Sequence, residues 1–124
     1  MKLLKCLHCQ NSAEVIDDHK VPLMCCGEKM FEYKAGETEG AGEKHIPVVQ
    51  VEGNKVTVKV GEVTHPMTEE HYIGVIWLVT DKTTHRAALS HTGTPEAVFA
   101  LADGEKPLEA YEFCNLHGLW KTTI

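Results

Sequence analysis

The fold of this 124-residue chain is decided by the stretch Val48-Val49-Gln50-Val51-Glu52-Gly53-Asn54-Lys55-Val56-Thr57-Val58-Lys59-Val60. Its two arms alternate β-branched apolar residues with polar ones, which is typical of strands that bury one face. Gly53-Asn54 separates the arms, and Gly in the first position favours the type II′ turn of a two-residue hairpin. The stretch therefore predicts an antiparallel β-hairpin.

Further strand signals follow this hairpin. Residues 72–79 form a continuous apolar run, which is consistent with a strand buried in a sandwich core. Weaker signals follow at residues 84–90, 96–101, 108–114 and 118–123. No long segment has helical periodicity. Seven short strands in about 80 residues predict an all-β fold, a seven-stranded antiparallel β-sandwich of immunoglobulin-like type.

The composition changes before the hairpin, where residues 34–42 hold three glycines and several charges without apolar periodicity. This pattern is typical of a linker. An apolar content of 43% suffices for one proper core but not two, so a small N-terminal module needs a staple such as a metal. We expect a metal module over residues 1–36, a linker over 37–42 and the sandwich over 43–124.

The charge and the cysteine count narrow the class of function. The formal net charge is −6 and no long basic run is present, which argues against nucleic acid as a partner. We find neither a signal peptide nor the roughly 20 apolar residues of a membrane span, so we expect a cytoplasmic protein without membrane association. Disulfides are disfavoured there, and five cysteines then indicate metal or redox chemistry.

Four of the cysteines precede the linker, as Cys6-x-x-Cys9 and the adjacent pair Cys25-Cys26. Two thiolates separated by two residues can face one ion from a tight turn, and a second pair completes a sulfur tetrahedron that suits iron or zinc. Adjacent side chains diverge, so we expect a distorted site, with Gly27 allowing the backbone to turn. A redox dithiol usually needs a βαβ context, which is missing here. Inert buried thiols would need a larger core.

The fifth cysteine and most histidines follow the linker. Five residues lie at predicted strand ends or in loops, and loops from distant strands gather at one end of a sandwich. They are His45, His65, His71, Cys114 and His117. The spacing Cys114-x-x-His117 is itself a metal-ligand spacing.

Four imidazoles and one thiolate are too many for tetrahedral structural zinc. They suit iron with five or six positions, one of them open to substrate. A cupredoxin-like copper site would need a Met soon after its last His, and Gly118-Leu119-Trp120-Lys121 offers none. His8 and His19 are expected to be solvated, and His85 and His91 to be surface or packing residues.

Together these residues resemble the desulfoferrodoxin family of superoxide reductases. The cysteine pairs resemble its desulforedoxin-like (rubredoxin-like) module, and three later segments resemble its active site. These are Glu43-Lys44-His45-x-Pro47, His65-Pro66-Met67 with His71, and Cys114-Asn115-x-His117-Gly118-Leu119-Trp120-Lys121. The sequence departs from the family pattern at Gln10, where the family usually has Gly, and at Leu4 and Lys5, where an aromatic residue is frequent.

The resemblance implies two irons per chain, one FeCys4 centre and one Fe(His)4Cys centre with the histidines equatorial and Cys114 axial. It implies one-electron reduction of superoxide to hydrogen peroxide, an external donor such as rubredoxin, and a homodimer. Lys44 adjoins the expected ligand His45 and can attract the anion that the net charge repels. By resemblance, Glu43 can occupy the open iron position. The charge of Lys121 can add to the positive field.

Two alternatives remain open at this point. The first is a two-centre iron electron-transfer protein without catalysis, in which azide or cyanide would find no open position on the ferric protein. The second is a zinc-stapled binding module, which would be colourless because zinc is d¹⁰.

Overall fold

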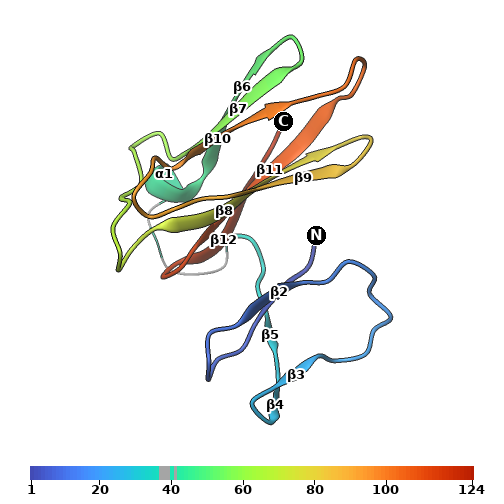
Figure 1. The fold of residues 1–124 in the computed structure, drawn as a ribbon, viewed down its shortest axis with the longest axis vertical. Helices are drawn as coiled ribbons and strands as arrows, with labels where there is room; N and C mark the ends of the chain where they lie inside the picture. Colours follow the sequence, from blue (N-terminus) through green and yellow to red (C-terminus); the bar gives the residue numbers. More distant parts are fainter. Residues whose placement is uncertain (37–39, 41) are drawn as a thin grey trace. The chain divides into compact units, whose positions relative to one another are not determined.

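The computed structural model describes residues 1–36, 40 and 42–124. The chain divides into two compact units, Met1–Lys34 and Ala35–Ile124 (Figure 1). The linker expected over residues 37–42 lies mostly outside the described residues. No helix in the described part of the chain is both long enough and apolar enough to cross a membrane.

The second unit is a β-sandwich. Its seven strands within the described residues are β6 (Pro47–Glu52), β7 (Lys55–Val60), β8 (Ile73–Thr80), β9 (Thr84–Ala88), β10 (Glu96–Ala100), β11 (Pro107–Cys114) and β12 (Gly118–Thr123). They form two antiparallel sheets with the strand orders β10-β7-β6 and β12-β11-β8-β9 (Figure 1). The core joins fully buried side chains of both sheets, among them Val56, Val58, Ile76 and Leu78. The predicted all-β fold is thus confirmed.

The hairpin formed by β6 and β7 follows the predicted register, since Glu52 pairs with Lys55 across Gly53-Asn54. Gly53 has a φ of 60° and Asn54 is not among the residues with positive φ, as a type II′ turn requires. The predicted hairpin and its turn are therefore both confirmed.

A bulge interrupts the pairing of β8 with β11 next to the end of both strands. Phe113 pairs with Val75, but the next residue, Cys114, pairs with Ile73, so Gly74 has no partner on β11. Bulges of this kind re-aim the side chains beside them. Here the bulge lies directly at Cys114.

A four-residue helix, α1 (Gly42–His45), precedes β6 and was not predicted, because one helical turn has no periodicity to detect. Two backbone hydrogen bonds hold it to the loop after β7, from Gly61 N–H to the Ile46 oxygen at 3.2 Å and from Val63 N–H to the Glu43 oxygen at 2.9 Å. Gly61 has a φ of 84°, and a Cβ there would collide with carbonyl oxygens of this junction. The fold therefore requires glycine at position 61, where α1 meets the sandwich.

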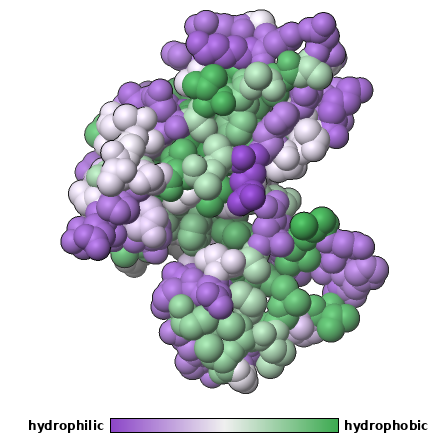
Figure 2. All heavy atoms as spheres, in the orientation of Figure 1, coloured by the Kyte–Doolittle hydropathy of each residue, from purple (hydrophilic) through white to green (hydrophobic). Residues whose placement is uncertain are grey.

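The first unit has very little core. Its strands are β1 (Leu3–Lys5), β2 (Ser12–Glu14) and β5 (Phe31–Glu32) in one sheet, and β3 (Met24–Cys25) with β4 (Glu28–Lys29) in a hairpin. Its buried apolar residues are Leu3, Leu4 and Cys6. Figure 2 shows apolar side chains on its surface, and the exposed ones include Leu7, Ile16, Val21 and Met24. This unit needs the staple that its cysteines can supply.

Candidate metal centres

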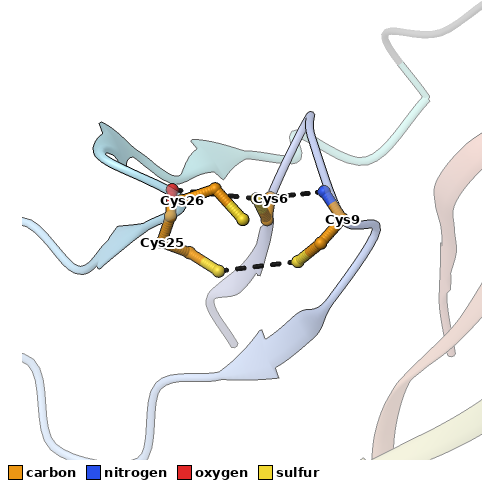
Figure 3. A group of neighbouring side chains, drawn as sticks. All are labelled: Cys6, Cys9, Cys25 and Cys26. Carbon is orange, nitrogen blue, oxygen red and sulfur yellow. Dashed lines mark hydrogen bonds between the residues drawn. The ribbon is translucent and has the colours of Figure 1, made fainter.

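The four cysteines of the first unit converge from two turns (Figure 3). Cys6 and Cys9 lie on the turn after β1, where the Cys9 N–H donates to the Cys6 Sγ at 3.4 Å. Cys25 and Cys26 lie at the turn between β3 and β4, and the sulfurs of Cys9 and Cys25 are 3.6 Å apart. All four sulfurs lie within 4.8 Å of one another.

The turn after β3 explains how adjacent cysteines can serve one site. Cys26 and Gly27 both have positive φ, 52° and 78°, which is the pattern of a type I′ turn in a two-residue hairpin. A left-handed conformation is uncommon for a residue other than glycine. It turns the chain between the two side chains, and in Figure 3 both sulfurs point toward Cys6 and Cys9.

The thiols of Cys6 and Cys26 have very different pKa values when no cation lies between them. The backbone N–H of Cys9 is the main reason that the pKa of Cys6 is lowered to about 6. Hydrogen bonds with the other sulfurs raise the pKa of Cys26 to about 12, and the bond with Cys9 has the largest effect. Four thiolates therefore need a cation between them, and an all-sulfur set fits iron or zinc.

The histidines of the first unit lie outside this cluster. His8 pairs with Glu28 at 3.0 Å, and His19 pairs with Asp17 at 3.0 Å. Both imidazoles are largely exposed, in agreement with their expected solvated role.

The second cluster gathers at one end of the sandwich. His45 comes from α1, His65 from the loop after β7, His71 from just before β8, and Cys114 from the end of β11. Their ligand atoms lie within 4.8 Å of one another. His117 joins them, because its Nδ1 is 3.1 Å from the His45 Nε2 and 3.8 Å from the Cys114 Sγ. The structure thus brings together all five residues selected from the sequence.

Two of these imidazoles present nitrogens that no group among the described residues satisfies. The Nε2 atoms of His65 and His71 are buried without a hydrogen-bond partner. Burial lowers the pKa of His65 to about 4 and also lowers that of His71, so both rings are neutral at pH 7. The His65 Nδ1 lies 2.7 Å from the Pro66 oxygen, which places the proton there and leaves the Nε2 lone pair for a metal. An ion at this point would satisfy both orphaned nitrogens.

Cys114 has no exposed surface, and burial raises the pKa of its thiol. The His117 N–H donates to its sulfur at 3.4 Å, which partly offsets that effect. A buried thiolate needs a cation beside it, so the donor set is complete only with a metal.

Two residues to which the sequence analysis assigned no role border this cluster. The Trp120 ring stacks on His45 with centroids 5.0 Å apart, and its Nε1–H donates to the His117 oxygen at 3.0 Å. Glu112 is fully buried, and neither of its carboxyl oxygens has a hydrogen-bond partner within residues 1–36, 40 and 42–124. Strand alternation could have identified Glu112 from the sequence, because it lies on the same face of β11 as the buried residues Ala110 and Cys114.

The charged residues expected near the site lie on or beside these elements. Lys44 is exposed on α1, and its charge is among the causes that lower the pKa of His71. Glu43 is exposed on the same helix and lines a groove with Ile46 and the end of β12. Lys121 pairs with Glu109 at 3.2 Å, which offsets part of its charge.

The remaining histidines of the sandwich lie apart from the cluster. His85 pairs with Glu105 at 2.7 Å, and the His91 ring lies 6.0 Å from that of Tyr72. Both therefore have the packing roles expected for them.

Comparison with known proteins gives a consistent result. The sequence model of the desulfoferrodoxin family matches residues 37–123. A desulfoferrodoxin homologue of Archaeoglobus fulgidus is 42% identical over 122 residues, which cover 98% of this chain and 96% of the relative. The desulfoferrodoxin of Nitratidesulfovibrio vulgaris is 42% identical over 120 residues, which cover 97% and 94% of the two chains.

Among solved structures, the superoxide reductase of Treponema pallidum has a TM-score of 0.81 and 42% identity, over 97% of this chain and 98% of that one. This likeness spans both units. The two donor sets, one of four sulfurs and one of four imidazoles with a thiolate, are consistent with two iron centres. The chain belongs to the desulfoferrodoxin family.

Proposed function

We propose that this protein is a superoxide reductase, which adds one electron and two protons to superoxide and forms hydrogen peroxide. The observation that carries the proposal is the cluster of four imidazoles around the buried Cys114 sulfur, a set larger than structural zinc uses. The superoxide reductase of Treponema pallidum, which this chain resembles over its whole length, supports it.

The ligands of the catalytic centre would be His45, His65, His71, His117 and Cys114. An iron held by these residues would supply one-electron redox chemistry. The Cys114 thiolate would donate electron density to the ion, and the His117 N–H donates a hydrogen bond to that sulfur.

Lys44 would attract and orient the substrate. Superoxide is an anion, and the chain has a formal net charge of −6. An ammonium group next to ligand His45 reverses the field locally and can donate a hydrogen bond to the bound anion. Glu43 lies on the same helix as Lys44 and would offer a carboxylate that could bind the ion between turnovers.

The ion at Cys6, Cys9, Cys25 and Cys26 would be a second iron. Cys9 and Cys26 are exposed, which suits electron entry from rubredoxin or a similar small carrier. The same centre also replaces the core that its unit lacks. We further propose a cytoplasmic homodimer.

The stoichiometry of peroxide tests the proposal. The iron-loaded protein is mixed with superoxide in the presence of reduced rubredoxin, and peroxide and oxidised rubredoxin are measured. A reductase yields one peroxide for each superoxide and oxidises the donor, whereas dismutation yields one peroxide for every two. Failure to consume superoxide above the spontaneous rate would favour the electron-transfer alternative, as would a ferric centre that binds neither azide nor cyanide.

A further inference from the structure

Asn115 lies on the turn from β11 to β12, between two of the proposed ligands, Cys114 and His117. The side chain of a turn residue is often solvated, but here it is half-buried and bonded at both of its polar atoms. None of the roles proposed above uses it.

Three hydrogen bonds connect Asn115 to the loop that carries His71. Its backbone N–H donates to the Tyr72 oxygen at 3.2 Å. Its Oδ1 accepts from the Tyr72 N–H at 2.9 Å, and its Nδ2 donates to the Glu70 oxygen at 2.8 Å. The amide therefore binds the backbone on both sides of His71.

The backbone hydrogen bonds of His71 itself are local. The His71 N–H donates to the Thr68 Oγ1 at 3.1 Å, and the His71 oxygen accepts from the Thr68 N–H at 2.9 Å. These bonds shape the turn but do not connect it to another element. The ladder between β8 and β11 ends at the pair Ile73–Cys114, beyond the bulge at Gly74. Asn115 continues that pairing by one residue, with its side chain in place of a backbone group.

The position of His71 matters because its Nε2 is buried and has no hydrogen-bond partner in the part of the chain that the structure describes. A ligand nitrogen must meet the ion within a few tenths of an ångström. A loop fixed only by its own turn could not hold an imidazole that closely relative to a thiolate on another strand.

We propose that Asn115 is a positioning residue, which fixes the His71 imidazole relative to Cys114 and His117 by clamping the two ligand loops together. The inference rests on the proposed metal site. Its consequence is that Asn115 sets how tightly the His–Cys centre holds its ion, although it touches neither ion nor substrate.

The experiment uses the full-length chain loaded with iron and challenged with a ferrous chelator. The rate of iron loss is followed for the centre whose ferric form shows the Cys114 charge-transfer band. Asn115→Ala removes both side-chain bonds, and we expect iron loss to be about 10- to 100-fold faster, the usual effect of removing a group that orients a ligand. Asn115→Asp keeps an acceptor for the Tyr72 N–H, and we expect an intermediate rate.

Asn54→Ala is the matched control. Asn54 also donates its side-chain amide across two loops, to Asp103, but it does so at the β6–β7 turn and far along the strands from the ligands. It should leave the rate of iron loss unchanged. Equal melting temperatures of the metal-free Asn115 and Asn54 variants would support an effect on the site rather than on the fold.

A double-mutant cycle tests whether Asn115 affects the rate of iron loss through His71. If Asn115 acts through His71, then Asn115→Ala should change the rate less than twofold in a His71→Ala background. An undiminished effect in that background would overturn the proposal, as would iron loss from Asn115→Ala at the wild-type rate. A wild-type chain that holds no iron with a thiolate band would overturn the proposed function as well.

Discussion

The two centres of this protein are built on turns of the same length in very different surroundings. In Cys6-x-x-Cys9 and in Cys114-x-x-His117, the N–H of the fourth residue donates to the sulfur of the first at 3.4 Å. The first turn belongs to a unit with three buried apolar residues, and two of its four sulfurs are exposed. The second closes a sandwich core, and its cysteine has no exposed surface.

The comparison separates what a turn provides from what its surroundings provide. The turn holds two donors at a spacing that suits one ion. The surroundings decide which other donors join the turn and how they are protonated, since burial at the sandwich end lowers the pKa of both His65 and His71. In the first unit the ion is a large part of the core, whereas in the second it is added to a core that is already complete.

The largest effect is expected at the buried turn. Cys114→Ser replaces the thiolate with a weak oxygen donor, so the thiolate-to-iron absorption should disappear. Superoxide reduction should fall by more than about 100-fold, beyond the loss from a group that only orients a ligand. Pulse radiolysis and the visible spectrum measure the two effects. A variant that kept both properties would show that Cys114 is not a ligand.

The next effect separates the centres. Cys25→Ser, or Cys6→Ser, should remove one iron and its charge-transfer colour, and should unfold most of the first unit, because a unit this small depends on its metal. The second centre should survive, since its ligands all lie in the sandwich. Iron analysis and circular dichroism give the readout. Loss of both irons from either variant would contradict two independent centres.

The third effect concerns charge alone. Lys44→Ala removes a positive charge and leaves all five ligands, so we expect encounter with superoxide to slow by roughly tenfold, at the low end of steering effects. The wild-type rate should also fall as salt rises. Lys55→Ala, an exposed lysine at the β6–β7 turn, is the control and should keep the wild-type rate. If the wild type, Lys44→Ala and Lys55→Ala reacted at equal rates without salt dependence, Lys44 would be an ordinary solvated lysine with no role in attracting superoxide.

The sequence predicted these features unequally, for physical reasons. The hairpin at Gly53-Asn54 was predictable because strand alternation and turn chemistry are local. The five ligands were predictable because each belongs to a short motif at a strand end. Helix α1 and the bulge at Gly74 were not, since a single turn has no period and a bulge depends on the partner strand. The clamp by Asn115 was not either, because its partners lie more than 40 residues away in the chain.

The smallest effect tests the departure at Gln10, where the family usually has glycine. Gln10 has a φ of 70°, a left-handed conformation that costs a residue with a Cβ about 1–2 kcal/mol. Gln10→Gly removes that strain, and after the larger entropy of glycine in the unfolded chain we expect the first unit to gain about 1 kcal/mol. Urea unfolding followed by the colour of the four-sulfur centre measures this gain.

In the second unit, Gln50→Gly should change the free energy of unfolding in the opposite direction. Gln50 is an exposed residue of β6 with ordinary strand geometry, so glycine there should destabilise the sandwich by about 0.5–1 kcal/mol. Both tryptophans lie in the sandwich, so their fluorescence follows that unit while the sulfur colour follows the first one. If Gln10→Gly destabilised the first unit as Gln50→Gly destabilises the second, the strain at Gln10 would be absent. The family's glycine would then need another explanation, such as close approach of the backbone to a partner.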